Sequence, residues 1–191
     1  MKQDIILSGV GGQGILSIAT VIGEAATAAG LSLKQAEVHG MSQRGGDVQS
    51  HLRLSDGEIF SDLIPAGKAD MVISMEPMEA LRYLPMLSKD GMIITSSTPF
   101  VNIPDYPDQT VLQAELDAQP NVHKADIESL AKEAGNPKGA NMVLLGMAAP
   151  YLGILTADQL RKALGIIFAR KGEAVVEANV KCFDLGLQLT K

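Results

Sequence analysis

A glycine-rich segment near the amino terminus constrains the fold of this chain more than any other feature. It reads Gly9-Val-Gly-Gly-Gln-Gly14 and follows Asp4-Ile-Ile-Leu-Ser, which has the apolar character of a core strand. Beyond it, apolar residues recur with the 3.6-residue period of a helix that packs on a sheet. They occupy positions 15, 18, 19, 22, 25, 26 and 29. A strand that passes through a glycine turn into such a helix predicts a Rossmann-like βαβ start.

The glycine segment is also a candidate anion site. Glycine lacks a Cβ and readily adopts positive φ, so its backbone amide can approach a ligand closely. The following helix begins with unpaired amides at the positive end of its dipole, which favours a phosphate. The candidate ligand-binding residues here are Gly9, Gly11, Gly12, Gln13 and Gly14. The alternative is a tight turn whose glycines only let the helix pack closely on the strand.

A second glycine segment adds a cation. Arg44 carries a permanent charge on a planar set of donors that suits phosphate or carboxylate, and it precedes Gly45 and Gly46, which permit close backbone approach. Arg44, Gly45 and Gly46 therefore complete the predicted binding set. The alternative is that Arg44 pairs with a nearby carboxylate at the entrance to a hairpin.

Two residues near this segment have other interpretations. Glu37 lies about 20 positions beyond Gly14, where a dinucleotide-binding protein places the acidic residue that binds a ribose hydroxyl. A solvated glutamate at a strand end explains it equally well. His39 stands beside a glycine and is more typical of a local hydrogen-bonding residue than of a catalytic base. No catalytic residue and no metal ligand is predicted, because the chain lacks nucleophile-elbow, HExxH and P-loop motifs.

Strand and helix patterns alternate along the rest of the chain. Asp47–Leu54 and Glu58–Ile64, joined by Asp56-Gly57, predict an antiparallel hairpin. Further strands are predicted at Ser32–Val38, Met71–Met75, Met92–Thr95 and Val122–Ala125. Further helices are predicted at Pro77–Leu87 with a break near Leu84, at Ile127–Ala134 capped by Asp126, from the Thr156-Ala-Asp-Gln159 capping box, and after Gly172. This order predicts a single α/β domain over residues 1–191, a three-layer α/β/α sandwich around a mostly parallel mixed sheet.

Composition narrows the possible partners. The net charge of -6 and the pI near 5.0 argue against a nucleic-acid surface, which needs clustered cations. The single cysteine, Cys182, excludes a four-thiolate cluster within one chain and is predicted to be a buried core thiol on a C-terminal helix. Ala140–Ala157 is uncharged but interrupted, so a buried helix ended or kinked at Pro150 is predicted instead of a membrane span. No secretory signal pattern is seen, which predicts a cytoplasmic protein.

Three segments carry a family resemblance. They are Gly9-Val-Gly-Gly-Gln-Gly14, Glu37-Val-His-Gly-Met-Ser-Gln-Arg-Gly-Gly46 and Asn141-Met-Val-Leu-Leu-Gly146. Together they resemble the gamma subunit family of the 2-oxoacid:acceptor oxidoreductases, the pyruvate/ketoisovalerate type, over nearly the whole chain. His39 and Ser42 depart from the pattern of pyruvate-type members, and the second segment is similar to the indolepyruvate:ferredoxin type, subunit beta.

The resemblance implies a subunit of an enzyme that oxidatively decarboxylates a 2-oxoacid, here indolepyruvate or another aryl pyruvate, to acyl-CoA with ferredoxin as acceptor. It implies that thiamine diphosphate and the 4Fe-4S clusters belong to a large partner subunit, while this chain assists assembly and contacts CoA. The candidates for holding the CoA phosphates are Gly11, Gly12, Gln13, Gly14 and Arg44. Two other functions remain open: a purely structural partner subunit, and an independent NAD- or FAD-dependent reductase.

Overall fold

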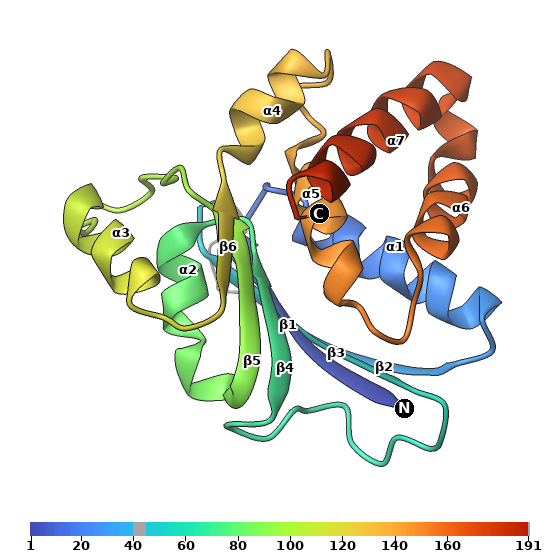
Figure 1. The fold of residues 1–191 in the computed structure, drawn as a ribbon, viewed down its shortest axis with the longest axis horizontal. Helices are drawn as coiled ribbons and strands as arrows, with labels where there is room; N and C mark the ends of the chain where they lie inside the picture. Colours follow the sequence, from blue (N-terminus) through green and yellow to red (C-terminus); the bar gives the residue numbers. More distant parts are fainter. Residues whose placement is uncertain (40–44, 191) are drawn as a thin grey trace.

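The structure is a computed structural model that describes residues 1–39 and 45–190. These residues form a six-stranded sheet with the strand order β2-β3-β1-β4-β5-β6 (Figure 1). The strands are β1 (Lys2–Val10), β2 (Ser32–His39), β3 (Asp47–Ser55), β4 (Ala69–Ser74), β5 (Leu87–Ser96) and β6 (Val122–Ala125). Neighbours from β1 to β6 run parallel, whereas β3 is antiparallel to both β1 and β2. The sheet is therefore mixed and mostly parallel, as predicted.

Helices cover both faces of the sheet and confirm the three-layer α/β architecture (Figure 1). On one face lie α1 (Ile15–Ala28), α5 (Ala140–Ala148), α6 (Ala157–Phe168) and α7 (Glu173–Gln188), with α4 (Ile127–Glu133) packed against α5 and α7. On the other face lie α2 (Pro77–Arg82) and α3 (Gln109–Asp117). Short 3-10 turns follow three of these helices, at Leu84–Met86, Ala149–Tyr151 and Ala169–Lys171.

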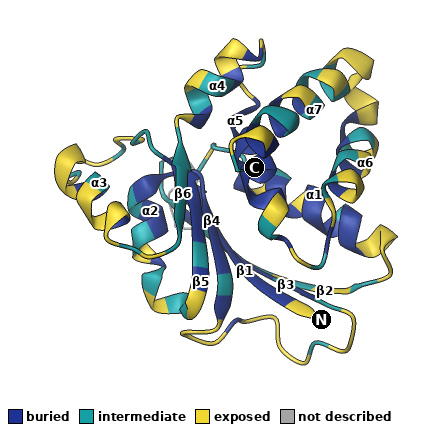
Figure 2. Cartoon of the chain, viewed as in Figure 1, coloured by how far each residue is buried: buried dark blue, intermediate teal, exposed yellow. Residues whose placement is uncertain are grey.

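The core is divided by the sheet into two unequal parts. Successive residues of a strand point to opposite faces, so Ile5 and Leu7 of β1 enter the larger cluster beneath α1 and α5, while Ile6 enters the smaller cluster beneath α2. All three side chains are fully buried. Burial on both faces explains why the central strands have continuous apolar sequences. Figure 2 shows exposed residues on α3, on the outer sides of α6 and α7, and along the loop between β3 and β4.

The predicted hairpin of Asp47–Leu54 with Glu58–Ile64 is wrong. The first segment is a strand, β3, but residues 58–64 form no strand. The antiparallel partners of β3 are instead β1 and β2, which occupy its two edges. Because a strand has only two hydrogen-bonding edges, the segment after Asp56-Gly57 has no edge of β3 to pair with.

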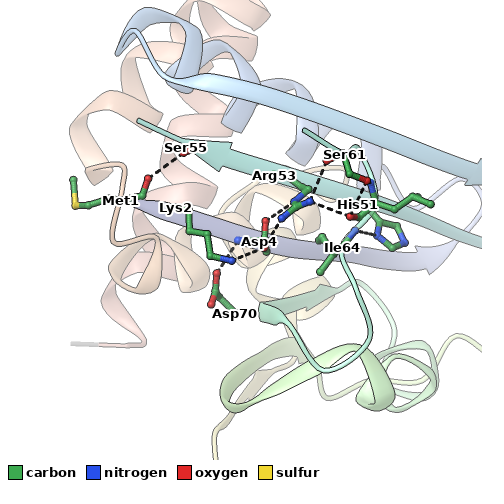
Figure 3. Close-up of polar contacts among 10 residues, drawn as sticks. Met1, Lys2, Asp4, His51, Arg53, Ser55, Ser61, Ile64 and Asp70 are labelled. Atoms are coloured by element: carbon green, nitrogen blue, oxygen red, sulfur yellow. Dashed lines mark hydrogen bonds and ion pairs between the residues drawn. The ribbon is translucent and has the colours of Figure 1, made fainter. Parts of the chain in front are cut away.

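An arginine on β3 holds part of this segment in place. The Arg53 guanidinium donates to the backbone carbonyls of Ser61 and Leu63 at 3.1 and 3.0 Å (Figure 3). Its other nitrogens bind both carboxylate oxygens of Asp4 at 2.8 and 3.1 Å. One planar donor group therefore replaces a hairpin ladder, since it satisfies carbonyls that no strand reaches.

Several local signals are confirmed. Asp126 caps α4 by accepting from the Ser129 amide at 2.9 Å, and the capping box at Thr156 is formed with Gln159. The predicted break after α2 coincides with the 3-10 turn at Leu84–Met86. Helix α3 was not predicted, because it is short and mostly exposed and therefore shows little apolar periodicity.

The uncharged stretch behaves as a buried helix. Every residue of α5 is buried, and the 3-10 turn that contains Pro150 ends it. Cys182 lies in the same core as a free, buried thiol, as predicted, and burial raises its pKa. Within the described part of the chain, none of the helices combines the length and the apolar character that crossing a membrane requires.

Candidate functional site

The glycine loop lies where the chain changes faces of the sheet. Strands β1 and β4 are parallel neighbours, but α1 leaves β1 on one face and α2 leaves β4 on the other. Such a switch point opens a crevice beyond the carboxyl ends of the two strands, and ligands of open α/β sheets bind in that crevice. The fold therefore places the predicted site where this class of sheet provides one.

Three glycines of the loop have different surroundings. Gly12 has φ 103°, is exposed, and a Cβ added there would meet no atom within 4 Å. Gly14 has φ 87°, and a Cβ there would lie 2.6 Å from Nδ2 of Asn141. Gly9 is buried, and a Cβ there would lie 3.0 Å from Oε1 of Gln13. Gly9 and Gly14 thus serve packing, whereas the space beside Gly12 is open.

Gln13 turns its side chain into the loop. Its Oε1 accepts from the Val10 amide at 2.7 Å, and its Nε2 lies 3.5 Å from the Met75 carbonyl at the end of β4. The Gln13 amide itself donates to the Val10 carbonyl at 3.1 Å. These contacts hold the turn in shape and join the ends of β1 and β4.

The two glycine segments lie together in the structure. The Gly11 amide donates to the Gly46 carbonyl at 2.9 Å, and Nδ2 of Asn102 donates to the Gly45 carbonyl at 2.7 Å. Gly45 has φ 83°, which only glycine adopts without strain. The amide of Gly11 is therefore engaged by the protein, and the loop around it is braced by the second segment.

The amides that remain for a ligand are those at the start of α1. Gly14 is the N-cap residue and offers no side-chain oxygen to the first turn. Among the described residues, none accepts a hydrogen bond from the amides of Gly12, Gly14 or Ile15. Unpaired amides at the positive end of a 14-residue helix are suited to a phosphate.

Some predicted residues stay predictions. Arg44 lies outside the described residues, as does the side chain of His39. Glu37 lies on β2 and contacts Gln35, whose Nε2 is 3.3 Å from its Oε2. Because β3 separates β2 from β1, Glu37 is two strands, or about 10 Å, from β1. A ribose-binding carboxylate needs the strand next to β1, so the geometry does not favour a dinucleotide site.

Two carboxylates at the start of α2 were missed by sequence reasoning. Glu76 is fully buried and caps α2 by accepting from the Glu79 amide at 2.9 Å. It also accepts from the Phe100 amide at 3.2 Å and from the Tyr106 hydroxyl. Pro77 was the available signal, because proline is favoured at the first helical position and a carboxylate just before it can accept from the first-turn amides.

The second carboxylate, Glu79, belongs to a cluster of polar side chains beside the glycine segments. The Tyr83 hydroxyl donates to both oxygens of Asp47 at 2.9 and 3.1 Å, and Arg82 pairs with Glu79 at 2.7 Å. Burial and the negative charge of Asp47 raise the pKa of Glu79, although Arg82 acts in the opposite direction. Burial and Asp47 likewise raise the pKa of Tyr83, so its hydroxyl remains a donor. Within residues 1–39 and 45–190, no group of acidic, histidine or cysteine side chains could hold a metal ion.

Comparisons with known proteins agree over almost the whole chain. The family described as pyruvate ferredoxin/flavodoxin oxidoreductase matches residues 4–189. The indolepyruvate oxidoreductase subunit IorB of Pyrococcus horikoshii is 37% identical, with 100% of this chain and 98% of that protein covered.

Two solved structures share the fold. The gamma subunit of a keto/oxoacid ferredoxin oxidoreductase from Geobacter sulfurreducens superposes with a TM-score of 0.75 at 25% identity, covering 100% of this chain and 97% of that one. The 2-oxoglutarate:ferredoxin oxidoreductase from Magnetococcus marinus, solved with 2-oxoglutarate, coenzyme A and succinyl-CoA bound, gives a TM-score of 0.78 at 21% identity. It covers 99% of this chain but only 31% of that longer chain.

Proposed function

Since this chain belongs to the pyruvate ferredoxin/flavodoxin oxidoreductase family, we propose that it is the small subunit of a ferredoxin-dependent 2-oxoacid oxidoreductase of the indolepyruvate type. The complete enzyme oxidatively decarboxylates an aryl pyruvate to its acyl-CoA and passes the electrons to ferredoxin. Full-length identity to an indolepyruvate oxidoreductase subunit supports this substrate class. A cytoplasmic location is part of the same proposal.

The chemistry of electron transfer falls to a large partner subunit. A 4Fe-4S cluster needs four thiolates, and this chain has one cysteine, which is buried in the core. The family resemblance implies that thiamine diphosphate, like the clusters, belongs to the partner. The contribution of this chain is assembly of the complex and binding of CoA, with the reaction itself taking place elsewhere.

The observation that supports CoA binding is the open space beside Gly12. The φ of 103° favours glycine at position 12, but no neighbouring atom would exclude a side chain there, and Gly12 borders α1 amides from which no described residue accepts a hydrogen bond. A phosphate of CoA placed there would accept from those amides. Arg44, Gly45 and Gly46 are proposed to complete the site. Leu16, exposed in the first turn of α1, and Val101, exposed beside Asn102, provide apolar surface near it.

The alternative of a purely structural subunit has its own support. Gly9, Gly14 and Gln13 make internal contacts that account for their presence without a ligand. Under that alternative, the loop would serve only to pack α1 against β1 and to shape the surface that meets the large subunit. A substitution at Gly12 separates the two functions, because Gly12 has no packing role to lose.

Gly12→Ala and Gly12→Val test the proposal in the complex reconstituted with the large subunit. Both variants should assemble, but the CoA concentration for half-maximal turnover should rise with side-chain size, by about ten- to a hundredfold for valine, because a charge-assisted contact is worth roughly 1.5–3 kcal/mol. CoA titration, thermal melting and co-elution with the large subunit are measured on the same preparations.

Gly172→Ala and Gly172→Val are the matched controls. Gly172 also precedes a helix, has φ 96° and faces open space, so it reports the cost of backbone strain alone. These variants should melt at lower temperature without a change in CoA titration. A stable Gly12→Val complex with a normal CoA titration would refute the CoA site and leave the structural function.

A further inference from the structure

The second glycine segment is held from outside by two side chains. Nδ2 of Asn102 reaches the Gly45 carbonyl, and the Tyr83 hydroxyl reaches the carboxylate of Asp47, one residue beyond Gly46. Both contacts join residues that are far apart in the sequence, separated by 57 and 36 positions. Side-chain hydrogen bonds thus hold residues 45–47 on both sides of Gly46.

The two ends of α2 support these side chains. Tyr83 follows the last residue of α2, and its side chain lies in the smaller core, where it is only 8% exposed. The loop that carries Asn102 is fixed through the buried carboxylate of Glu76, which accepts from the Phe100 amide and the Tyr106 hydroxyl. Helix α2 therefore supports both contacts.

Backbone contacts connect residues 45–47 to the glycine loop: Asp47 pairs with Val10 at the end of the β1–β3 ladder, and Gly46 bonds to Gly11. Gly46, between the two held positions, accepts from the amide of Gly11, and Gly11 precedes the exposed Gly12. Displacement of residues 45–47 would therefore release or shift the loop at the point where it meets open space. A Cβ added at Gly45 or at Gly12 would meet no atom within 4 Å, so the backbone contacts are what join the two segments there.

The Tyr83 hydroxyl has a specific partner, Asp47, among the charged groups around it. Asp47 lies near a second carboxylate, Glu79. The Arg82 guanidinium donates to the two oxygens of Glu79 at 2.7 and 3.2 Å. The hydroxyl is thus a neutral donor to Asp47 in a group that also contains Glu79 and Arg82. A phenylalanine would keep the ring in the core but leave Asp47 to the repulsion of its neighbour.

We infer that Tyr83 and Asn102 are positioning residues: without touching the ligand, they hold the second glycine segment against the glycine loop and thereby set the affinity of the site for a phosphate-bearing ligand. The first half of this inference concerns the loop alone, and the second half rests on the proposed CoA function. The two halves are tested separately.

Hydrogen exchange tests the first half without any ligand. In Tyr83→Phe and Asn102→Ala, exchange in peptides that contain the Gly11 amide should accelerate by about threefold or more, because local opening becomes easier. Peptides from β4 and β5 should exchange at the wild-type rate. The matched controls are Tyr151→Phe and Asn121→Ala; Asn121 also donates to a backbone carbonyl, that of Gly91. Unchanged exchange around Gly11 would overturn the inference.

CoA titration of the reconstituted complex tests the second half. Tyr83→Phe and Asn102→Ala should raise the KM for CoA about three- to tenfold with kcat retained, the range of a lost hydrogen bond. A fall in kcat at unchanged KM would overturn the positioning role. If Gly12→Val raises the CoA requirement but these variants do not, the inference fails while the proposed function stands. If Gly12→Val has no effect either, the proposed function has failed, and hydrogen exchange alone decides the first half.

Discussion

At the scale of single residues, a largely buried ion pair lies at the amino end of β1, opposite the candidate site. Asp4 is 2% exposed and binds Arg53 through both oxygens, while Lys2 adds a contact at 3.0 Å (Figure 3). Burial raises the pKa of Asp4, but the hydrogen bonds and charges of Arg53 and Lys2 outweigh it, so the pKa lies below its usual value. This lowered pKa makes stability depend on pH.

The sign of that dependence follows from proton binding. At pH values between the folded and the unfolded pKa of Asp4, the unfolded chain holds a proton that the folded chain does not. The stability that Asp4 contributes is therefore fully present above the unfolded pKa, and it is lost as the pH falls through the folded pKa. Asp4→Asn should therefore lower the free energy of unfolding by about 2–4 kcal/mol near pH 6, and the difference from wild type should shrink toward pH 3. Urea denaturation at both pH values measures it.

Asp62→Asn provides the control, since Asp62 pairs with Lys34 at 3.2 Å on the surface. Exposed pairs contribute about 0–1 kcal/mol, so this variant should resemble wild type at both pH values. An Asp4→Asn difference that stays constant from pH 6 to pH 3 would mean that the charge of Asp4 does not stabilise the fold.

At the scale of elements, α5 and α7 touch through their backbones. A Cβ at Gly146 of α5 would lie 2.0 Å from the Phe183 carbonyl oxygen, and a Cβ at Gly186 of α7 would lie 1.9 Å from that of Val143. Such distances require glycine on both helices. The Asn141–Gly146 segment, which supported the family resemblance, is therefore structural at both ends, since Asn141 donates to the Gly14 carbonyl at 3.1 Å.

We predict that Gly146→Ala lowers the free energy of unfolding by about 3 kcal/mol, because the helices must separate to admit the methyl group. Gly165→Ala in α6 is the matched control: no atom lies within 4 Å of the added Cβ, and alanine should stabilise that helix by about 1 kcal/mol. Thermal or urea unfolding of the two variants compares them directly. Equal stabilities would show that the helix contact yields easily and is not the reason for glycine at position 146.

At the scale of the whole molecule, the chain is one part of a larger catalyst. The purified protein alone should be colourless and should not reduce an electron acceptor with indolepyruvate and CoA, since a single cysteine cannot hold a cluster. Mixing it with the large subunit should restore activity, with co-elution of the two chains. The measurements are the visible absorption spectrum and acceptor reduction before and after mixing.

Reduction of the acceptor by this polypeptide alone, with the large subunit shown to be absent, would contradict the division of labour. Separate elution of the two chains at concentrations where the mixture is active would argue against a stable complex. Bleaching of a flavin spectrum or binding of NADH by the isolated chain would favour the independent reductase.

Sequence alone determined the features that depend on neighbouring residues. The apolar period from Ile15 predicted α1, the alternation of apolar runs predicted the parallel strands, and Asp126 and Thr156 marked helix starts that the structure confirms. Each of these signals lies within a single helix, strand or cap and depends on residues no more than about four positions apart. The two glycine segments and Asn141–Gly146 carried the resemblance to a known family, which the family match over residues 4–189 confirms.

Only the tertiary structure decided what joins distant segments. The insertion of β3 between β1 and β2 removed the predicted hairpin and moved Glu37 away from the glycine loop. The contacts of Tyr83 with Asp47 and of Asn102 with Gly45 likewise leave no periodic trace in the sequence. A strand edge or a hydrogen-bond acceptor takes whichever partner the packing of the whole chain brings to it, so its partner is set by the free energy of the entire fold and cannot be read from the residues beside it.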